Sequence, residues 1–135
     1  MSHHPAFHPA VAKSTGKLQN VLLWALQVAV AAMFLMAGVS KLTGAEQMVA
    51  VFEAVGIGQW FRFLTGGMEV GGAILLLLPA FTGFGALVLA TVMAGAIFTH
   101  LFVIGGSSLL PIVLLVALAA IAYGRRERTL RVLGR

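Results

Sequence analysis

A long stretch without acidic or basic side chains dominates the pattern of polar and apolar residues along this chain. Between Val70 and Gly124 there is no Asp, Glu, Lys or Arg, and His100 is the only readily ionisable residue. Glu69 stands directly before this stretch and Arg125 directly after it. The outer surface of a soluble domain needs charge, whereas lipid solvates an uncharged apolar surface. The pattern therefore predicts an integral membrane protein.

Glycine, proline and charged residues divide the apolar sequence into four predicted membrane spans. These are Leu18–Ser40, Phe63–Leu78, Phe84–Ile104 and Leu109–Tyr123. At 1.5 Å of helical rise per residue, roughly 20 residues cross a hydrocarbon core of about 30 Å. Because short loops at Pro79–Gly83 and Gly105–Ser107 join the later spans, successive spans must alternate in direction. The expected fold class is an all-α membrane protein, an antiparallel bundle of four transmembrane helices.

The segment Gly44–Trp60, between the first two spans, has a different pattern. Apolar residues alternate there with polar ones that include Glu46 and Glu53, and glycines follow at its end. Two acids in one short segment argue against a membrane span, so we predict an amphipathic helix at the interface. Aromatic residues follow it, with Arg62 expected among them at the level of the lipid headgroups.

The positive charge of the chain is concentrated at its two ends. Lys13, Lys17 and five arginines after Gly124 account for seven of the nine basic residues, and Lys41 and Arg62 are the other two. The positive-inside rule then places both termini of a multi-pass protein in the cytoplasm. The arginines are expected to anchor the chain at anionic lipid rather than to bind nucleic acid.

The corresponding domain limits are residues 1–17, a disordered cytoplasmic tail, residues 18–124, the transmembrane domain, and residues 125–135, a basic cytoplasmic tail.

Composition excludes several kinds of chemistry. Hydrophobic residues make up 60% of the chain and charged residues 10%, and there is no cysteine. Disulfides, thiol redox catalysis and cysteine-ligated clusters are therefore excluded. Haem held by two histidines would need a second histidine within the spans, and His3, His4 and His8 lie in the N-terminal tail instead. No metal site is expected.

Three ionisable residues fall at similar depth in the predicted bundle. Lys41 ends the first span, Glu69 lies about 9 Å into the second, and His100 lies about 6 Å before the end of the third. Alternating helices bring all three to the outer leaflet. Since charge in hydrocarbon costs roughly 2.5–3.5 kcal/mol at mid-membrane, Glu69 is expected to form an ion pair with Lys41 or a hydrogen bond with His100.

Two interpretations of this cluster are open on sequence grounds. Intramembrane ionisable residues are often functional, so the cluster could handle protons or polarise a ligand. It could also be a structural clasp between helices. The residues that share the helix face of Glu69 are small enough for close packing of the second span, namely Thr65, Gly66, Gly72 and Ala73. Gly67 and Gly71, which flank Glu69 in a GxxxG pattern, are also predicted to pack closely.

Three segments together resemble the DoxX-like family of membrane proteins. These are Met36–Leu42 (MAGVSKL) at the end of the first span, Gly66–Gly72 (GGMEVGG) in the second and Ala94–His100 (AGAIFTH) near the end of the third. Their order and spacing carry the resemblance, which extends over about residues 21–123. The matching motif positions again include Lys41, Glu69 and His100.

The resemblance implies a small bacterial plasma (inner) membrane protein associated with a quinone-linked oxidoreductase or an oxidative-stress complex. We expect a non-catalytic membrane subunit, without a covalently bound cofactor, that contacts lipid, a soluble or membrane redox partner, and quinone. Two alternatives are a small proton-coupled carrier component and a purely structural membrane module. Four short helices enclose little volume for transport unless several copies associate, so a homo-oligomer is a further expectation.

Overall fold

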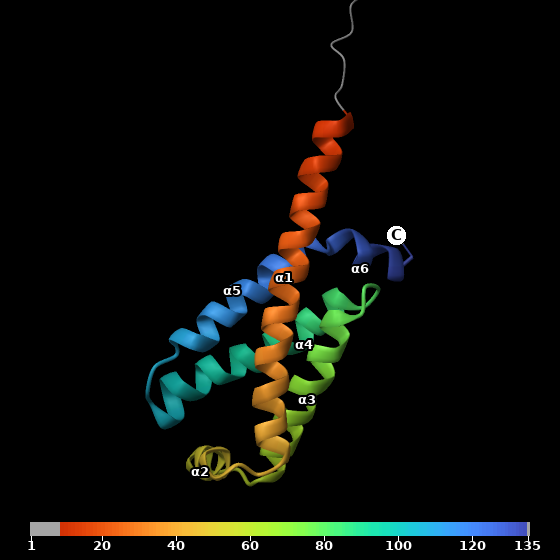
Figure 1. Cartoon of the computed structure of the whole chain (residues 1–135). Helices are drawn as coiled ribbons and strands as arrows, with labels where there is room; N and C mark the ends of the chain where they lie inside the picture. Colours follow the sequence, from red (N-terminus) through yellow and green to blue (C-terminus); the bar gives the residue numbers. More distant parts are fainter. Residues whose placement is uncertain (1–8, 135) are drawn as a thin grey trace, which may run out of the picture.

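Figure 1 shows the computed structural model, which describes residues 9–134. The elements in chain order are α1 (Pro9–Leu42), α2 (Glu46–Val55), α3 (Trp60–Leu77), α4 (Thr82–Thr99), the π-helix η1 (His100–Ile104), α5 (Leu109–Gly124) and α6 (Arg126–Val132). Every element within these residues is helical, as the sequence predicts.

The first helix is longer than its membrane span. It begins at Pro9, whereas the sequence analysis expects it to start at Leu18. Proline suits the first helical position because its missing N–H would have no partner there. Alanine and lysine, both good helix formers, recur over residues 10–17 and extend the helix. Residues 9–17 of the predicted tail are therefore helical, and residues 1–8 lie outside the described part of the chain.

The short helix α2 occupies the segment predicted to be amphipathic. It ends at Gly56, whose φ of 86° only glycine adopts readily, and the Gly56 N–H donates to the Phe52 carbonyl. Phe52 is buried, with its ring centroid 5.9 Å from that of Phe61 in α3, while Glu46 and Glu53 are exposed. One face of α2 thus packs on the other helices, and it contacts α1, α3 and η1.

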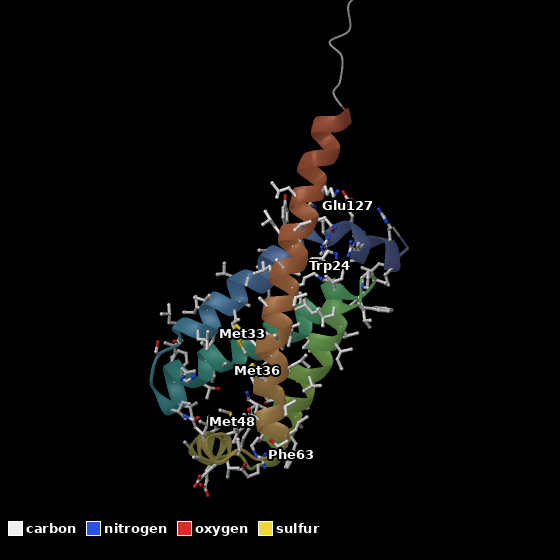
Figure 2. All side chains as sticks on the ribbon, in the orientation of Figure 1. Trp24, Met33, Met36, Met48, Phe63 and Glu127 are labelled. Atoms are coloured by element: carbon white, nitrogen blue, oxygen red, sulfur yellow. The ribbon has the colours of Figure 1, made fainter. Side chains whose placement is uncertain are left out.

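Three of the described helices are long and apolar enough to cross a membrane, and a fourth candidate is bent. The three are residues 16–42 of α1, α3, and α4 together with η1. The helices α5 and α6 form the bent candidate, with an angle of 63° between them. Large exposed apolar side chains cover the helices (Figure 2), including Met36 of α1, which is 73% exposed. Such a surface suits lipid.

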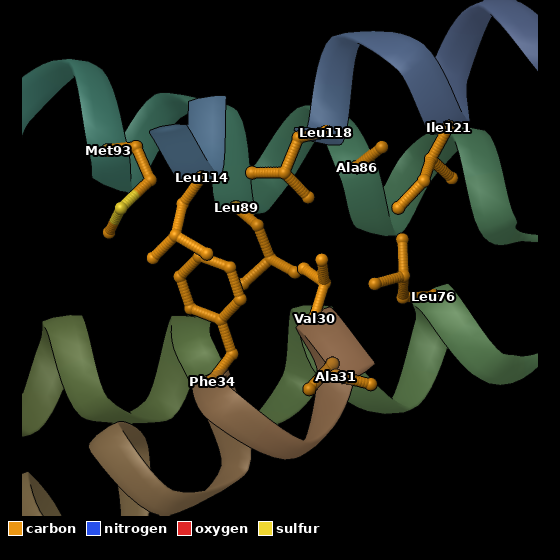
Figure 3. Packing of buried hydrophobic residues seen from close by; sticks show 11 residues of the cluster. Val30, Ala31, Phe34, Leu76, Ala86, Leu89, Met93, Leu114, Leu118 and Ile121 are labelled. Atoms are coloured by element: carbon orange, nitrogen blue, oxygen red, sulfur yellow. The ribbon is translucent and has the colours of Figure 1, made fainter. Parts of the chain in front are cut away.

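The long apolar helices that are neighbours along the chain, leaving out the short α2, pack side by side around one apolar core. The helix α1 packs on α3, α3 on α4 and α4 on α5, and α1 also contacts α5. In Figure 3 the ring of Phe34 points from α1 toward Leu89 and Leu114. The buried core residues are Val30, Ala31, Phe34, Ala73, Leu76, Ala86, Leu89, Met93, Leu114, Leu118 and Ile121.

Glycines let the backbones of neighbouring helices approach closely. A Cβ atom on Gly85 of α4 would lie 2.5 Å from the Leu76 nitrogen and 2.7 Å from the Gly72 oxygen of α3. A Cβ atom on Gly38 of α1 would lie 2.9 Å from the Gly66 oxygen. These distances leave no room for a side chain, so small residues set the helix spacing, as is common in membranes.

The predicted packing pair Gly67 and Gly71 is wrong for the contacts within this chain. A Cβ atom on either residue would have no neighbour within 4 Å, whereas Gly66 and Gly72, one position away, face α1 and α4. Each residue turns a helix by about 100°, so adjacent glycines point to different sides. The GxxxG spacing identifies a helix with small residues but not which of them meets the neighbouring helix.

Replacing Gly85 by alanine is expected to destabilise the bundle, because the added methyl group collides with α3 backbone rather than with a flexible side chain. Overpacking of this kind costs about 1–3 kcal/mol. Gly95→Ala in the same helix is the matched control, since a Cβ atom there meets nothing within 4 Å. The free energy of unfolding in detergent micelles tests this, and equal stability of the two variants would contradict the packing.

Candidate functional site

Lys41 and Glu69 meet where the end of α1 packs on α3. Lys41 lies in the last turn of α1, and Glu69 lies in the third turn of α3. The Lys41 Nζ is 2.7 Å from the Glu69 Oε1, and the two side chains are 15% and 2% exposed. This ion pair is the first of the two arrangements that the sequence predicts.

The same two glycines that bring α1 and α3 together also position the ion pair. Gly38 precedes Lys41 by three residues, and Gly66 precedes Glu69 by three, so each glycine lies about one turn from its charged neighbour on the same helix face. A Cβ atom on Gly66 would lie 2.9 Å from the Lys41 Cβ. Because Gly38 and Gly66 have no side chains, the backbones of α1 and α3 approach closely there. One turn further along each helix, Lys41 and Glu69 therefore come into contact.

The ion pair is buried on its carboxylate side. Glu69 Oε1 is inaccessible to water, and the Lys41 ammonium lies 2.7 Å from it. In a buried site, removing one partner of such a pair typically costs about 3–5 kcal/mol, because the other charge is left uncompensated. The pair is therefore a clasp between α1 and α3.

Arg62 hydrogen-bonds to the backbone at the same end of α1. Its side chain is buried, and it donates from Nη1 to the Lys41 carbonyl and from Nε to Gln59 Oε1 at 2.7 Å. Gln59 in turn donates from Nε2 to the Val49 carbonyl of α2 at 3.1 Å. A helix end leaves its last carbonyls unpaired, and Arg62 satisfies one of them. The sequence predicts Arg62 near this level but gives no signal for these partners.

His100 does not bond to either residue of the ion pair. It is half-buried at the start of η1, and its Nδ1 is 2.9 Å from the Gly105 carbonyl oxygen. Since a carbonyl only accepts, Nδ1 is the donor of this hydrogen bond. Among the described contacts His100 makes none with Glu69, so the second predicted arrangement is not formed. The bond closes the last turn of the α4–η1 helix.

A second polar cluster, which the sequence analysis does not predict, lies at the opposite end of the bundle. Gln27 of α1 is fully buried and donates from Nε2 to the Leu76 carbonyl of α3 at 2.9 Å. Arg125 donates from Nε to Gln27 Oε1 and from Nη1 to Asn20 Oδ1, each at 2.8 Å. The Arg125 side chain is buried, so it is not part of the solvated surface of the basic C-terminal segment. Gln27, the polar residue nearest the middle of the apolar span, was the available signal.

The site offers ionic and hydrogen-bonding groups rather than metal ligands. Within residues 9–134 no three His, Cys, Asp or Glu side chains gather closely enough to hold a metal ion. The Lys41 and Glu69 side chains are paired with each other. His100 is half-buried, and among the described contacts only its Nδ1 is hydrogen-bonded.

Lys41→Met is expected to lower the free energy of unfolding by about 3 kcal/mol, because it leaves the Glu69 carboxylate unpaired. Lys41→Met/Glu69→Met should be more stable than Lys41→Met alone, since apolar replacements remove both buried charges. Reversible unfolding of these two variants and of Glu69→Met in mixed micelles measures the coupling, with Lys17→Met, at an exposed position of α1, as control. Additive effects of Lys41→Met and Glu69→Met in the double variant would show that the ion pair does not hold the helices.

Comparison with known proteins identifies the family of this chain. The sequence model of the DoxX-like family matches residues 25–122, a segment that contains Lys41, Glu69 and His100. No curated protein and no solved structure matches the chain significantly. Because the matched segment covers most of the chain, and the described helices are long and apolar enough for a membrane, the protein is a member of the DoxX-like family.

Proposed function

We propose that this protein is a non-catalytic subunit of the bacterial plasma membrane that works with a quinone-linked oxidoreductase. In this proposal the partner supplies the redox cofactor. This chain anchors the partner in the bilayer and provides a surface where quinol or quinone approaches. Its family membership and its apolar helices support the membrane part of the proposal.

The proposed topology is an antiparallel bundle of four spans with both termini in the cytoplasm. Basic residues support it, because seven of the nine lie before Leu18 or after Gly124. The helix α2 would lie at the opposite interface, which its buried Phe52 and exposed Glu46 and Glu53 support.

The observation that carries the quinone part is the half-buried imidazole of His100 at the end of α4. Its Nδ1–H donates to the Gly105 carbonyl, which leaves Nε2 to accept a hydrogen bond from a quinol hydroxyl. Phe98 and Phe102, two residues before and after His100, lie on a different face of the helix and pack against each other, with ring centroids 5.0 Å apart.

The closed ion pair favours a subunit over a proton-coupled carrier. A carrier needs an ionisable group that water or substrate reaches during the cycle. Glu69 is 2% exposed and its charge is already compensated by Lys41. The two grooves found on the surface, between α1 and the α5–α6 bend and between α4 and α5, are lined by neither residue.

Quinone should co-purify with the protein in mild detergent, and His100→Ala should reduce the amount bound by about five- to tenfold, the loss expected for one hydrogen bond. Thr99→Ala is the matched control, because the Thr99 hydroxyl bonds the Gly95 carbonyl of its own helix. Chromatography of the extracted lipids, together with quinol oxidation by membranes that carry each variant, measures both effects. Absence of quinone from the wild-type protein, or equal activity of the His100→Ala membranes, would contradict the proposal.

The cysteine-free sequence allows a direct test of the proposed topology. Ser107→Cys, at an exposed turn position, should react with a membrane-impermeant maleimide in intact cells. Arg131→Cys, at an exposed position of α6, should react only after the membrane is permeabilised. The reverse pattern would place the termini outside, and labelling of both positions in intact cells would contradict a C-terminal segment in the cytoplasm.

A further inference from the structure

An open, mostly apolar groove runs between α4 and α5. Its volume is about 400 Å³, and its walls are small or aliphatic side chains that include Ala86 and Ala90 of α4 and Leu115 and Ala119 of α5. Alanines on both helices leave a channel that larger side chains would fill. In a bilayer, a surface channel of this composition adjoins acyl chains.

The groove ends at a positive charge where α5 bends into α6. Arg126 lines the groove together with Thr129. Arg126 Nη1 donates to the Tyr123 carbonyl at 2.7 Å, and its guanidinium lies 4.0 Å from the centroid of the Tyr123 ring. These contacts hold the guanidinium at the apolar–polar boundary while most of its five N–H donors point elsewhere.

A second, polar groove of about 260 Å³ lies on the other side of the same bend, between α1 and α5. Arg126 lines this groove as well, together with Arg125, Asn20 and the carboxylate-bearing Glu127. Figure 2 places Glu127 at this end of the molecule, with the basic helix α6. One arginine therefore reaches both an apolar channel and a polar recess.

Positive charge at this bend exceeds what the protein itself compensates. Arg125, Arg126 and Arg128 lie close together in sequence at the bend, and the charges of Arg125 and Arg128 act on each other. Glu127 supplies a single negative charge against these three. Like charges in excess at one place favour an anion there.

We infer that the α5–α6 bend binds one anionic phospholipid, with its phosphate at Arg126 and one acyl chain in the groove between α4 and α5. The arginines recognise the phosphate, and the alanine-lined groove recognises the chain. Free phosphate would use only the first of these features, which is why the lipid is the favoured source of the anion. Such a lipid would also hold α6 at the membrane surface.

The test is native mass spectrometry and lipid-dependent thermal unfolding of the full chain in detergent, with phosphatidylglycerol, phosphatidylcholine or inorganic phosphate added. We expect one retained phosphatidylglycerol, weaker retention of phosphatidylcholine and no stabilisation by inorganic phosphate. Arg126→Gln should weaken phosphatidylglycerol binding by about fivefold, the contribution of one arginine near an anionic headgroup. Arg131→Gln, at an exposed position that lines neither groove, should leave binding unchanged.

A second pair of variants tests the apolar part independently. Ala119→Phe would fill the groove, whereas Ala120→Phe adds the same bulk at an exposed position outside it. Only Ala119→Phe should reduce lipid retention. Equal retention of phosphatidylglycerol and phosphatidylcholine would overturn the role of charge, and stabilisation by inorganic phosphate alone would assign the site to free anions. A change of oligomeric state in Ala119→Phe without loss of lipid would make the groove a protein interface and overturn the inference.

Discussion

The close approach of α1 to α3 is the constraint on which the rest of the structure depends. Burial takes the Glu69 carboxylate out of contact with solvent, so its charge needs a partner within the protein, and Lys41 supplies it. The ion pair in turn requires backbones so close that only glycine fits at Gly38 and Gly66. When α1 and α3 are joined in this way, the Gly72 face of α3 packs on α4. The helix α4 in turn packs on α5, and α5 contacts α1.

Two polar clamps, one near each end of the apolar core, fix the register of α1. At one end Lys41 and Arg62 join α1 to α3, and at the other Gln27 joins it both to α3 and to Arg125 after α5. Apolar side chains between the clamps pack well in many registers, because hydrocarbon contacts differ little from contacts with lipid. Directional bonds within the membrane therefore select one arrangement from several of similar packing energy.

The proposed activities depend on which polar side chains are buried between helices and which lie at the surface. The buried ionisable groups Lys41 and Glu69 pair with each other, and the groups of the two proposals lie at the ends of the α4–η1 helix and of α5. His100 is half-buried at one such end, and Arg126 lines an alanine-rich groove at the other. A subunit built in this way would bind at its lipid-facing surface and leave its core unchanged.

The sequence by itself determined the membrane location, the all-helical class and the approximate spans, because these follow from apolar length and from the breaks at Pro79 and Gly105. It also narrowed the partners of Glu69 to Lys41 or His100, since depth follows from counting residues along a helix. Only the tertiary structure decided which face of each helix meets which neighbour, because that depends on how every helix is rotated about its own axis. This brought Gly38 against Gly66 and Gln27 to Arg125, 98 residues away, and no local pattern encodes such contacts.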